Sequence, residues 1–531
     1  MSTQPENDSN TPSPAVRPEL AELRARLAAT RDEGRPEAVA KRRKTGQRTA
    51  RENIVDLLDH DSFSEYGALA LAAQRQRHDL DTLIRISPAD GIVCGMGTVN
   101  SAHFGEERAR AMVLAYDYTV FAGTQGAMGH KKLDRMLALA REWRVPVVLF
   151  AEGGGGRPND TDLQTVAGLD TPSFLAFAAL SGLVPLVGIA SGRCFAGNAA
   201  LLGCCDVIIA AEDSTIGMGG PAMIEGGGLG VFKPEEVGPI DVQSKNGVVD
   251  VRVRDEAEAV AVAKKYLSYF QGPLTKWTCA DQTSLRDALP ERRRRAYKIR
   301  PIIETIADEG SVLELRRDFG RSLVTALVRI EGQPFGLLAN DTFHLGGAID
   351  ADAADKATRF LQLCDAFGLP IVSLCDTPGF MVGPQAEKTA LVRHVSRIFV
   401  TAASLSVPYF TVVLRKGYGL GAQAMAGGHF HSPFFTISWP TGEFGGMNLE
   451  GAVRLAMRKE LEAIEDAVTR EESFQAMVAV AYERGKALNM ASLLEIDAVI
   501  DPAETRSWVL RGLRSVPKPS RPGKRRIVDT W

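Results

Sequence analysis

The stretch VPYFTVVLRKGYGLGAQAM, residues 407–425, decides how the rest of the sequence is organised. Its apolar first half ends in Arg415 and Lys416, and glycines and small helix-forming residues follow. This pattern predicts a strand, a tight turn and the start of a helix. The N–H groups of a first helical turn have no partner inside the helix, so such a junction offers donors to a developing oxyanion. A turn whose glycines serve only packing is the alternative.

The same pattern occurs a second time, in VPLVGIASGRCFAGNAAL at residues 184–201. The repeat extends upstream, because KLDRMLALAREWRVP (132–146) aligns without a gap on KATRFLQLCDAFGLP (356–370). Each segment then leads through an apolar strand to an acid at the same offset, Glu152 or Asp376, and to a loop that the backbone can line. One long unit used twice predicts two related domains.

Length and composition fit two ordinary globular domains. The chain has 531 residues, which is too long for one core, and 45% of them are hydrophobic and 24% charged. A formal net charge of -3 gives no reason to expect nucleic acid or an anionic membrane as a partner. No apolar run approaches the ~20 residues that cross a bilayer. The 7 cysteines lie mostly in apolar segments, which suits buried thiols in a reducing compartment, so we expect a cytoplasmic protein.

The domain boundaries follow from shifts in composition. Residues 1–18 are polar and proline-rich, which predicts a disordered leader rather than a signal or transit peptide. The charged stretch 281–299 predicts a linker. We therefore expect an N-terminal domain over 19–280 and a C-terminal domain over 300–515. Residues 516–531 form a proline-rich, basic tail.

Local patterns predict several elements of the first domain. Amphipathic spacing predicts helices over 19–30 and 49–58, and apolar runs predict paired strands over 91–99 and 110–117. Residues 63–87 carry few strand signals and are expected to form an irregular cover. Alternating strands and helices predict α/β domains with mainly right-handed crossovers. Periodicity alone also permits a Rossmann-like sheet.

Rival chemistries find little support in the sequence. It contains no G-x-S-x-G nucleophile elbow, no G-x-x-x-x-G-K-[ST] phosphate loop and no C-x₂-C pair. His429 and His431 are a possible metal pair, but no ligand cluster accompanies them, and we interpret them as loop histidines. The basic runs 41–44 and 292–295 are interpreted as solvated faces, although the first could contact an acidic ligand group.

The repeated strand–acid–glycine loop and the strand–RKxYG loop resemble a known family. The family is the carboxyltransferase (β) subunit of biotin-dependent acyl-CoA carboxylases, such as propionyl-, acetyl- and methylcrotonyl-CoA carboxylases. The resemblance covers nearly the whole chain, from KTGQRTARENIVDLLD (44–59) to EIDAVIDPAETRSWVLRGL (495–513). YDYTVFAGTQGAMGHKK and LVRIEGQPFGLLAND lie between them in the family's order. The resemblance implies two tandem crotonase-like domains, each a β-β-α superhelix.

The resemblance also implies the chemistry and the site. Carboxyl transfer from carboxybiotin to an acyl-CoA builds charge on the thioester carbonyl and on the biotin ureido carbonyl, and backbone N–H pairs would stabilise both. The ureido nitrogen can take the α-proton, so no protein base is required. Carried over residue by residue, the thioester hole falls on Gly197 and Asn198, and the biotin hole falls on Gly421 and Ala422. Acyl-CoA-binding is implied for Gly153, Gly154, Gly155, Gly156 and Arg157, and biotin-binding for Thr377, Pro378, Gly379 and Phe380.

Partners follow from the same resemblance. The active site is expected between the N-domain of one subunit and the C-domain of another, in a hexamer of two stacked rings. The sequence has no Met-Lys-Met attachment site, so biotin is expected on a biotin carboxylase or biotin carboxyl carrier subunit. ATP is expected to act on a different chain, and we expect no metal.

Two departures from the family leave alternatives open. The family has Gly-Gly where this chain has Gly197-Asn198, and Gly-Gly-Ala-Tyr-Asp opposite residues 420–424, which puts Ala424 in the place of the acid. Both changes bear on acyl choice, so the substrate and its chain length stay open. A biotin-dependent acyl-CoA decarboxylase or a transcarboxylase shares both glycine turns. A non-catalytic scaffold of a carboxylase complex is the third interpretation.

Overall fold

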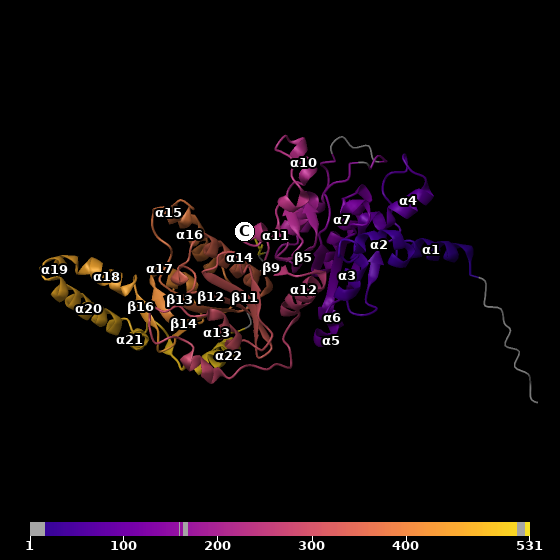
Figure 1. Ribbon diagram of the computed structural model, residues 1–531. Coiled ribbons are helices and arrows are strands. Elements are labelled where there is room, and N and C mark those ends of the chain that lie inside the picture. The colour runs from indigo at the N-terminus through magenta and orange to yellow at the C-terminus, as the bar shows by residue number, and fades with distance from the viewer. Residues whose placement is uncertain (1–15, 159, 163–167, 518–525) are drawn as a thin grey trace, which may run out of the picture.

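The computed structural model describes residues 16–158, 160–162, 168–517 and 526–531. The predicted leader lies outside these ranges apart from its last three residues. The described chain forms two halves, each built on its own β-sheet (Figure 1). The N-terminal half, indigo to magenta, lies on the right of the view, and the orange and yellow C-terminal half lies on the left.

The two sheets have the same topology. At one edge of each sheet the middle one of three strands is antiparallel to both neighbours, and the strands that follow are parallel to their neighbours. The N-terminal order is β1 (Ser64–Tyr66), β2 (Ile92–Thr98), β3 (Arg110–Tyr116), β4 (Val147–Phe150), β5 (Leu186–Ala190), β7 (Val207–Ala211) and β9 (Val251–Val253). The C-terminal order is β10 (Leu313–Leu315), β11 (Leu323–Ile330), β12 (Gln333–Asn340), β13 (Ile371–Thr377), β14 (Tyr409–Tyr418), β15 (Phe435–Ser438) and β17 (Ala498–Val499), with β16 (Glu443–Gly445) beside β14.

This strand-for-strand match confirms the repeat that the sequence predicts. A Rossmann-like sheet is mostly parallel, so the antiparallel edge of each sheet argues against that alternative. Strands β6 (Arg193–Phe195) and β8 (Thr215–Gly217) form a small separate ladder in the N-terminal half.

Helices connect and cover the strands of each sheet. In the N-terminal half they are α1 (Pro18–Ala28), α2 (Pro36–Arg43), α3 (Ala50–Leu57), α4 (Leu80–Ile86), α5 (Ser101–Phe104), α6 (Glu106–Ala109), α7 (Ala127–Trp143), α8 (Ser173–Ala178), α9 (Gly197–Gly203), α10 (Pro221–Gly226), α11 (Ile240–Gln243) and α12 (Glu256–Gln271). In the C-terminal half they are α13 (Ile299–Ile306), α14 (Ala351–Phe367), α15 (Pro384–Glu387), α16 (Leu391–Ala402), α17 (Gly419–Met425), α18 (Leu449–Ala456), α19 (Arg458–Glu462), α20 (Ala467–Arg484), α21 (Ala487–Ser492) and α22 (Thr505–Ser515). Within the described ranges, no helix is both long and apolar enough to cross a bilayer.

Most local predictions are confirmed. Helix α3 starts at a capping box in which Thr49 Oγ1 accepts from the N–H of Glu52 and the Glu52 carboxylate accepts from the N–H of Thr49. Strands β2 and β3 pair antiparallel, as expected for 91–99 and 110–117. The irregular cover expected over 63–87 is partly wrong, because β1 and α4 form there. A strand of three residues at a sheet edge carries too little pattern to be recognised.

The two halves share one buried core. Helix α12 contacts β7 of the N-terminal sheet and β11 and β12 of the C-terminal sheet. Tyr266 and Tyr269 on this helix belong to the same cluster of buried side chains as Leu327 and Phe360 of the other half. The end of the tail also lies between the halves, near the letter C in Figure 1. There the N–H of Val528 donates to a serine hydroxyl of the N-terminal half, and the Trp531 indole donates to Asp355 in α14.

The lysines that the repeat alignment pairs have the same role in both halves. Lys356 Nζ donates to the carbonyl oxygens of Phe319 and Leu323 at 2.9 and 2.7 Å, and Lys132 donates to two carbonyls at the corresponding place before β2. Each lysine therefore ties its long helix, α14 or α7, to the chain that enters the sheet. Burial lowers the pKa of Lys356 to about 7.

Replacing Lys356 by methionine should remove a pH dependence of stability. An unfolded lysine has a pKa of about 10.4, so between pH 7 and 10 the unfolded chain binds more protons than the folded chain. The contribution of Lys356 to the free energy of unfolding should therefore rise by about 1.4 kcal/mol per pH unit over this range. Thermal unfolding of wild type and K356M from pH 7 to 10 measures this. The exposed neighbour variant K131M is the control, and a difference between wild type and K356M that stays flat with pH would contradict the prediction.

Candidate active site

The two strand–turn–helix junctions predicted from the sequence form in the structure. In the C-terminal half β14 runs to Tyr418, and α17 starts at Gly419, whose φ of +57° suits glycine. In the N-terminal half β6 ends at Phe195 and α9 starts at Gly197. The N–H of Ala200 donates to the carbonyl of Ala196 at 2.8 Å, which is the first intrahelical bond of α9. The N–H groups of the three residues before Ala200 therefore lack acceptors inside the helix.

The donors of α17 differ slightly from the predicted pair. Because α17 starts at Gly419, its three free N–H groups belong to Gly419, Leu420 and Gly421. Ala422 is the fourth helical residue, where a regular helix provides an acceptor for the N–H. The structure therefore places Gly421, together with Leu420, which the sequence prediction did not include, in the first turn of α17, and Ala422 directly after them. Counting the first turn from the glycine after the RKGY motif would have indicated Leu420.

The predicted glycine loops pack against these helix starts. In the N-terminal half, a Cβ built on Gly155 would lie 3.4 Å from the N atom of Gly197. In the C-terminal half, a Cβ built on Gly421 would lie 2.6 Å from the Cα of Gly379 and 3.0 Å from the N atom of Phe380. The structure thus brings each predicted loop to its predicted helix start. The close approach of Gly379 leaves no room for a Cβ on Gly421.

Other backbone bonds fix the same loops. The N–H of Gly153 donates to the carbonyl of Arg193 at 2.8 Å, which ties the first loop to β6. In the second loop, Thr377 Oγ1 accepts from the N–H of Gly379 at 3.1 Å, across Pro378. Gly154 and Gly156 are exposed, and a Cβ built on Gly156 would meet nothing within 4 Å, so this edge of the first loop is open to a ligand.

Asn198, which departs from the family's glycine, is a buried clamp on the first loop. Its side-chain oxygen accepts from the N–H of Gly155 at 3.0 Å, and its amide nitrogen donates to the carbonyls of Gly123 and Glu152 at 3.3 and 3.4 Å. In the C-terminal half Asn340, at the end of β12, has a similar role. Its side-chain amide donates to the carbonyl of Gly347, and its side-chain oxygen accepts from the N–H of Asp376, the acid before the second loop. Asn198 therefore positions the loop through its side chain, and its N–H stays available in the first turn of α9.

Replacing Asn198 by aspartate should loosen the N-terminal site alone. A carboxylate of the same shape places an oxygen against two carbonyl oxygens and loses both donated bonds, at a cost of about 1–3 kcal/mol. We expect a lower melting temperature and at least tenfold weaker acyl-CoA binding, both measured on the purified protein. The matched variant N340D should lose similar stability and keep acyl-CoA affinity within about threefold. Equal loss of acyl-CoA affinity in the two variants would contradict the assignment of the acyl-CoA site to the N-terminal half.

Arg157 forms ion pairs with two carboxylates of its own chain. Its side chain is 4% exposed, and Nη1 lies 2.6 Å from Asp90 Oδ1 and 3.3 Å from Asp160 Oδ1. The guanidinium also stacks on the ring of Phe121. A direct contact of Arg157 with CoA would break this pairing, so the geometry gives Arg157 the task of holding the end of the glycine loop.

The acids that precede the two loops are buried anchors. Glu152 receives two bonds from Arg42, at 2.8 and 2.5 Å, and Asp376 receives bonds from Arg415 at 3.1 Å and from the Tyr297 hydroxyl at 2.8 Å. Burial raises the pKa of Glu152 to about 7, and the bonds from Arg42 oppose this rise. Arg42 belongs to the basic run 41–44, so the interpretation of that run as a solvated face is wrong for this residue, which is 6% exposed.

The second basic run is exposed but makes contacts. Arg294 pairs with Glu450 at the start of α18, and Arg293 lies over the ring of Tyr482 in α20. The linker therefore holds the arm formed by α18 to α21, which projects at the lower left of Figure 1.

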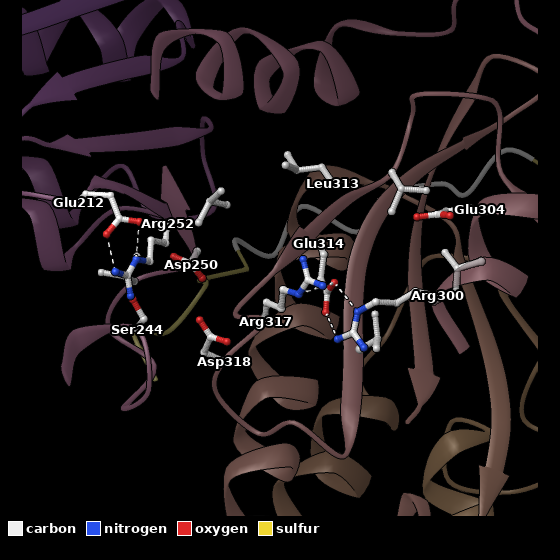
Figure 2. A pocket seen from close by; sticks show the side chains of 15 residues that line it. Glu212, Ser244, Asp250, Arg252, Arg300, Glu304, Leu313, Glu314, Arg317 and Asp318 are labelled. Carbon is white, nitrogen blue, oxygen red and sulfur yellow. Dashed lines mark hydrogen bonds and ion pairs between the residues drawn. The ribbon is translucent and has the colours of Figure 1, made fainter. Parts of the chain in front are cut away.

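A cavity of about 520 Å³ lies between the two halves but does not suit CoA. Figure 2 shows that its guanidinium groups are paired with carboxylates. Arg252 pairs with Glu212 and with an aspartate of α11, and Arg300 pairs with Glu314. Asp318 and other acids outnumber the arginines in its lining. Such a wall repels the phosphates of CoA.

Histidines and acids form no metal site in the described part of the chain, where no group of three or more His, Cys, Asp or Glu side chains is placed to hold an ion. The N–H of His431 donates to the ring of His429 at 3.0 Å. This bond occupies one ring nitrogen of His429 and fits the interpretation of the pair as loop histidines.

Comparison with known families assigns this duplicated α/β chain to a class of carboxyl-transferring enzymes. The chain matches the carboxyl transferase domain family over residues 41–524 and belongs to it. It is a carboxyltransferase of the biotin-dependent acyl-CoA carboxylases.

Curated relatives match this chain over nearly their whole length. The chain is 32% identical over 509 residues to the biotin-dependent long chain acyl-coenzyme A carboxylase beta4 subunit of Mycobacterium tuberculosis, with 92% of each chain covered. It is 31% identical over 525 residues to the methylmalonyl-CoA carboxyltransferase 12S subunit of Propionibacterium freudenreichii subsp. shermanii, covering 96% of this chain and 95% of that one.

Solved structures confirm the expected crotonase-like fold. A single-chain, multi-domain long-chain acyl-CoA carboxylase matches 94% of this chain with a TM-score of 0.89 and 60% identity. This chain spans 49% of that protein's length. The transcarboxylase 12S subunit, solved as a hexamer with methylmalonyl-CoA bound, matches 97% of this chain and 99% of its own with a TM-score of 0.83 and 29% identity.

Proposed function

We propose that the chain transfers a carboxyl group from carboxybiotin, carried by a partner chain, to the α-carbon of an acyl-CoA. The observation that carries this proposal is the packing of a glycine loop against a free first helical turn, once in each half. Two such turns supply donors for two carbonyl oxygens, and the reaction develops charge on two carbonyl oxygens.

The N-terminal half is the proposed acyl-CoA side. The N–H groups of Gly197 and Asn198 point out of the first turn of α9, where they would stabilise the thioester oxygen. The backbone of residues 153–156 would lie along the CoA, because Gly154 and Gly156 are exposed on that edge. Arg157 keeps this loop in place from behind.

The C-terminal half is the proposed biotin side. The N–H groups of Leu420 and Gly421 would hold the ureido carbonyl, with residues 377–380 forming the facing wall. Glycine at position 421 allows this close approach, because a Cβ there would stand 2.6 Å from the Cα of Gly379. Carboxybiotin supplies the activated carboxyl group and, once that group has left, a ureido nitrogen that can accept the α-proton.

The protein's own contribution is electrostatic preorganisation. Main-chain donors are fixed by the fold, so they need no reorganisation as charge develops, and removing one such donor costs roughly 10²–10³ in rate. Glu152 and Asp376 are buried and paired with arginines, which leaves neither placed to act as a general base.

The active site is proposed to form between chains. The two junctions belong to different sheets of one chain, and the transcarboxylase 12S relative is a hexamer. A homo-hexamer would place the N-terminal half of one subunit against the C-terminal half of another. The free thiols of the described chain, most of them buried, suit a reducing compartment such as the cytoplasm.

Long-chain acyl-CoA thioesters are the proposed substrates. The support is the identity of 60% and 32% to two relatives whose names specify long chains. A transcarboxylase acting on short branched acyl-CoAs is the second candidate, favoured by the 31% identity to the 12S subunit.

The test is to isolate the native complex and probe it for a biotinylated chain and a biotin carboxylase. ATP- and bicarbonate-dependent carboxylation is then assayed over acyl-CoAs of graded length. We expect turnover that increases with chain length. An intact complex that carboxylates none of them would refute the proposal, and transfer between acyl-CoA and a keto acid without ATP would favour the second candidate.

A further inference from the structure

A second cavity, of about 830 Å³, opens beside α17 in the C-terminal half. Gly419 and Gln423 of α17 are among its lining residues. These residues are four apart, so they share one face of α17. Helices α18, α20 and α21 provide the other walls, and Figure 1 shows these helices as the arm that extends beyond α17. The cavity therefore borders one face of α17, including its first residue, Gly419, where the helix carries free N–H groups.

The walls of this cavity suit an unbranched hydrocarbon. Leu449 and Val453 come from α18, Met477 from α20 and Met490 from α21. Methionine side chains adapt to flexible apolar ligands. The volume lies within the ~300–1,000 Å³ of small-molecule sites. Val480, which also lines the cavity, is 53% exposed, so part of this apolar surface is uncovered in the single chain.

We propose that this cavity binds the acyl chain of the acyl-CoA beyond its reacting carbon and so sets chain-length preference. The inference rests on the proposed function. There, the α-carbon must reach the carboxyl group held at the first turn of α17, so the β-carbon and the rest of the chain start next to Gly419. The cavity is the apolar space that begins at this place and continues away from the donors.

Gln423 stands where the acyl chain would enter. Gln423 is part of the cavity lining, and its side chain is neutral. If the family's Gly-Gly-Ala-Tyr-Asp is placed on the observed helix start, Gly419, its acid falls opposite Gln423 and not Ala424. A carboxylate at this position would disfavour an apolar chain, because burying it beside hydrocarbon is costly. The loss of the acid thus agrees with an apolar occupant.

Calorimetry with the assembled protein and acyl-CoAs from C4 to C12 tests the proposal. Burial of a methylene is worth about 0.8 kcal/mol, or roughly fourfold, so we expect Kd to fall two- to fourfold per added methylene. The variant A481F fills the cavity from α20 and should reduce the total gain from C4 to C12 at least tenfold. The variant A476F places the same ring on the exposed face of α20 and should bind every length as wild type does.

Photolabelling of the wild-type protein gives a readout that does not depend on any variant's folding. A palmitoyl-CoA analogue with a diazirine at its terminal carbon should label peptides within residues 445–495. If labelling falls outside these residues, or if acyl-CoAs bind with a Kd independent of length, the cavity assignment is wrong and the proposed function stands. Equal weakening of all lengths in A481F would assign the cavity to the biotin carrier or to a second copy of the chain. Failure of every acyl-CoA to bind would refute the proposed function itself.

Discussion

Replacing Leu420 by proline should lower the rate of carboxyl transfer by roughly 10²–10³-fold, because it removes one main-chain donor from the biotin-side turn. Proline fits this position: Leu420 is the second residue of α17, where φ is already helical and the helix makes no use of the N–H. The leucine side chain is 60% exposed, so its loss removes little packing. Carboxylation by the complex with its biotinylated partner measures the effect.

Two controls separate the donor from the side chain. The variant L420A keeps the N–H and should stay within about threefold of wild-type turnover, and light scattering should show the same oligomer for both variants. Proline at Gly197 or Gly421 also removes a donor, but its Cβ would collide with Gln125 or lie 2.6 Å from Gly379. Wild-type turnover in L420P would remove Leu420 from the site.

Replacing Arg42 by alanine should destabilise the N-terminal half by about 3–5 kcal/mol, because Glu152 would remain as a buried charge without its partner. Arg42 also donates to Gln47 and to the carbonyl of Arg48, so several groups lose bonds together. The defect should grow as the pH rises from 6 to 8. Without Arg42 the raised pKa of Glu152 rises further, so the folded chain keeps this proton to a higher pH while the unfolded chain has lost it, and stability falls as the pH rises.

The neighbouring arginine provides the matched control. Arg43 pairs with Glu52 at the surface, so R43A should change the free energy of unfolding by no more than about 1 kcal/mol. The double variant R42A/E152Q removes the orphaned charge and should regain part of the lost stability. Thermal and urea unfolding report both effects. If E152Q gives no rescue, the cost of R42A comes from packing and not from the buried carboxylate.

The elements of this fold were accessible from the sequence because their signals are local. Apolar alternation and turn glycines lie within a few residues of one another, and they placed β14, α17 and the β2–β3 pair correctly. The alignment of 132–146 on 356–370 required only that one pattern occur twice. The cavity beside α17 gave no such signal, because its walls come from residues 417 to 495 spread over several short helices.

The residues of the candidate site also fall into two groups, those that local sequence patterns predict and those whose roles depend on distant contacts. Gly197, Gly379 and Gly421 were predictable, since close backbone approach demands glycine at fixed places in a repeated motif. The roles of Asn198 and Arg157 were not, because each side chain acts on groups far along the chain, such as Gly123 for Asn198 and Asp90 for Arg157.

The sequence by itself determined a duplicated α/β unit with a glycine-lined turn and a glycine loop in each half. Only the tertiary structure decided which N–H groups are free, which charges are buried and where an apolar chain finds room. The physical reason is the distance along the sequence between the residues that interact. Periodicity and turn preference are set by neighbours in the chain, whereas the pairing of Arg42 with Glu152 joins residues 110 positions apart and exists only once the core has formed.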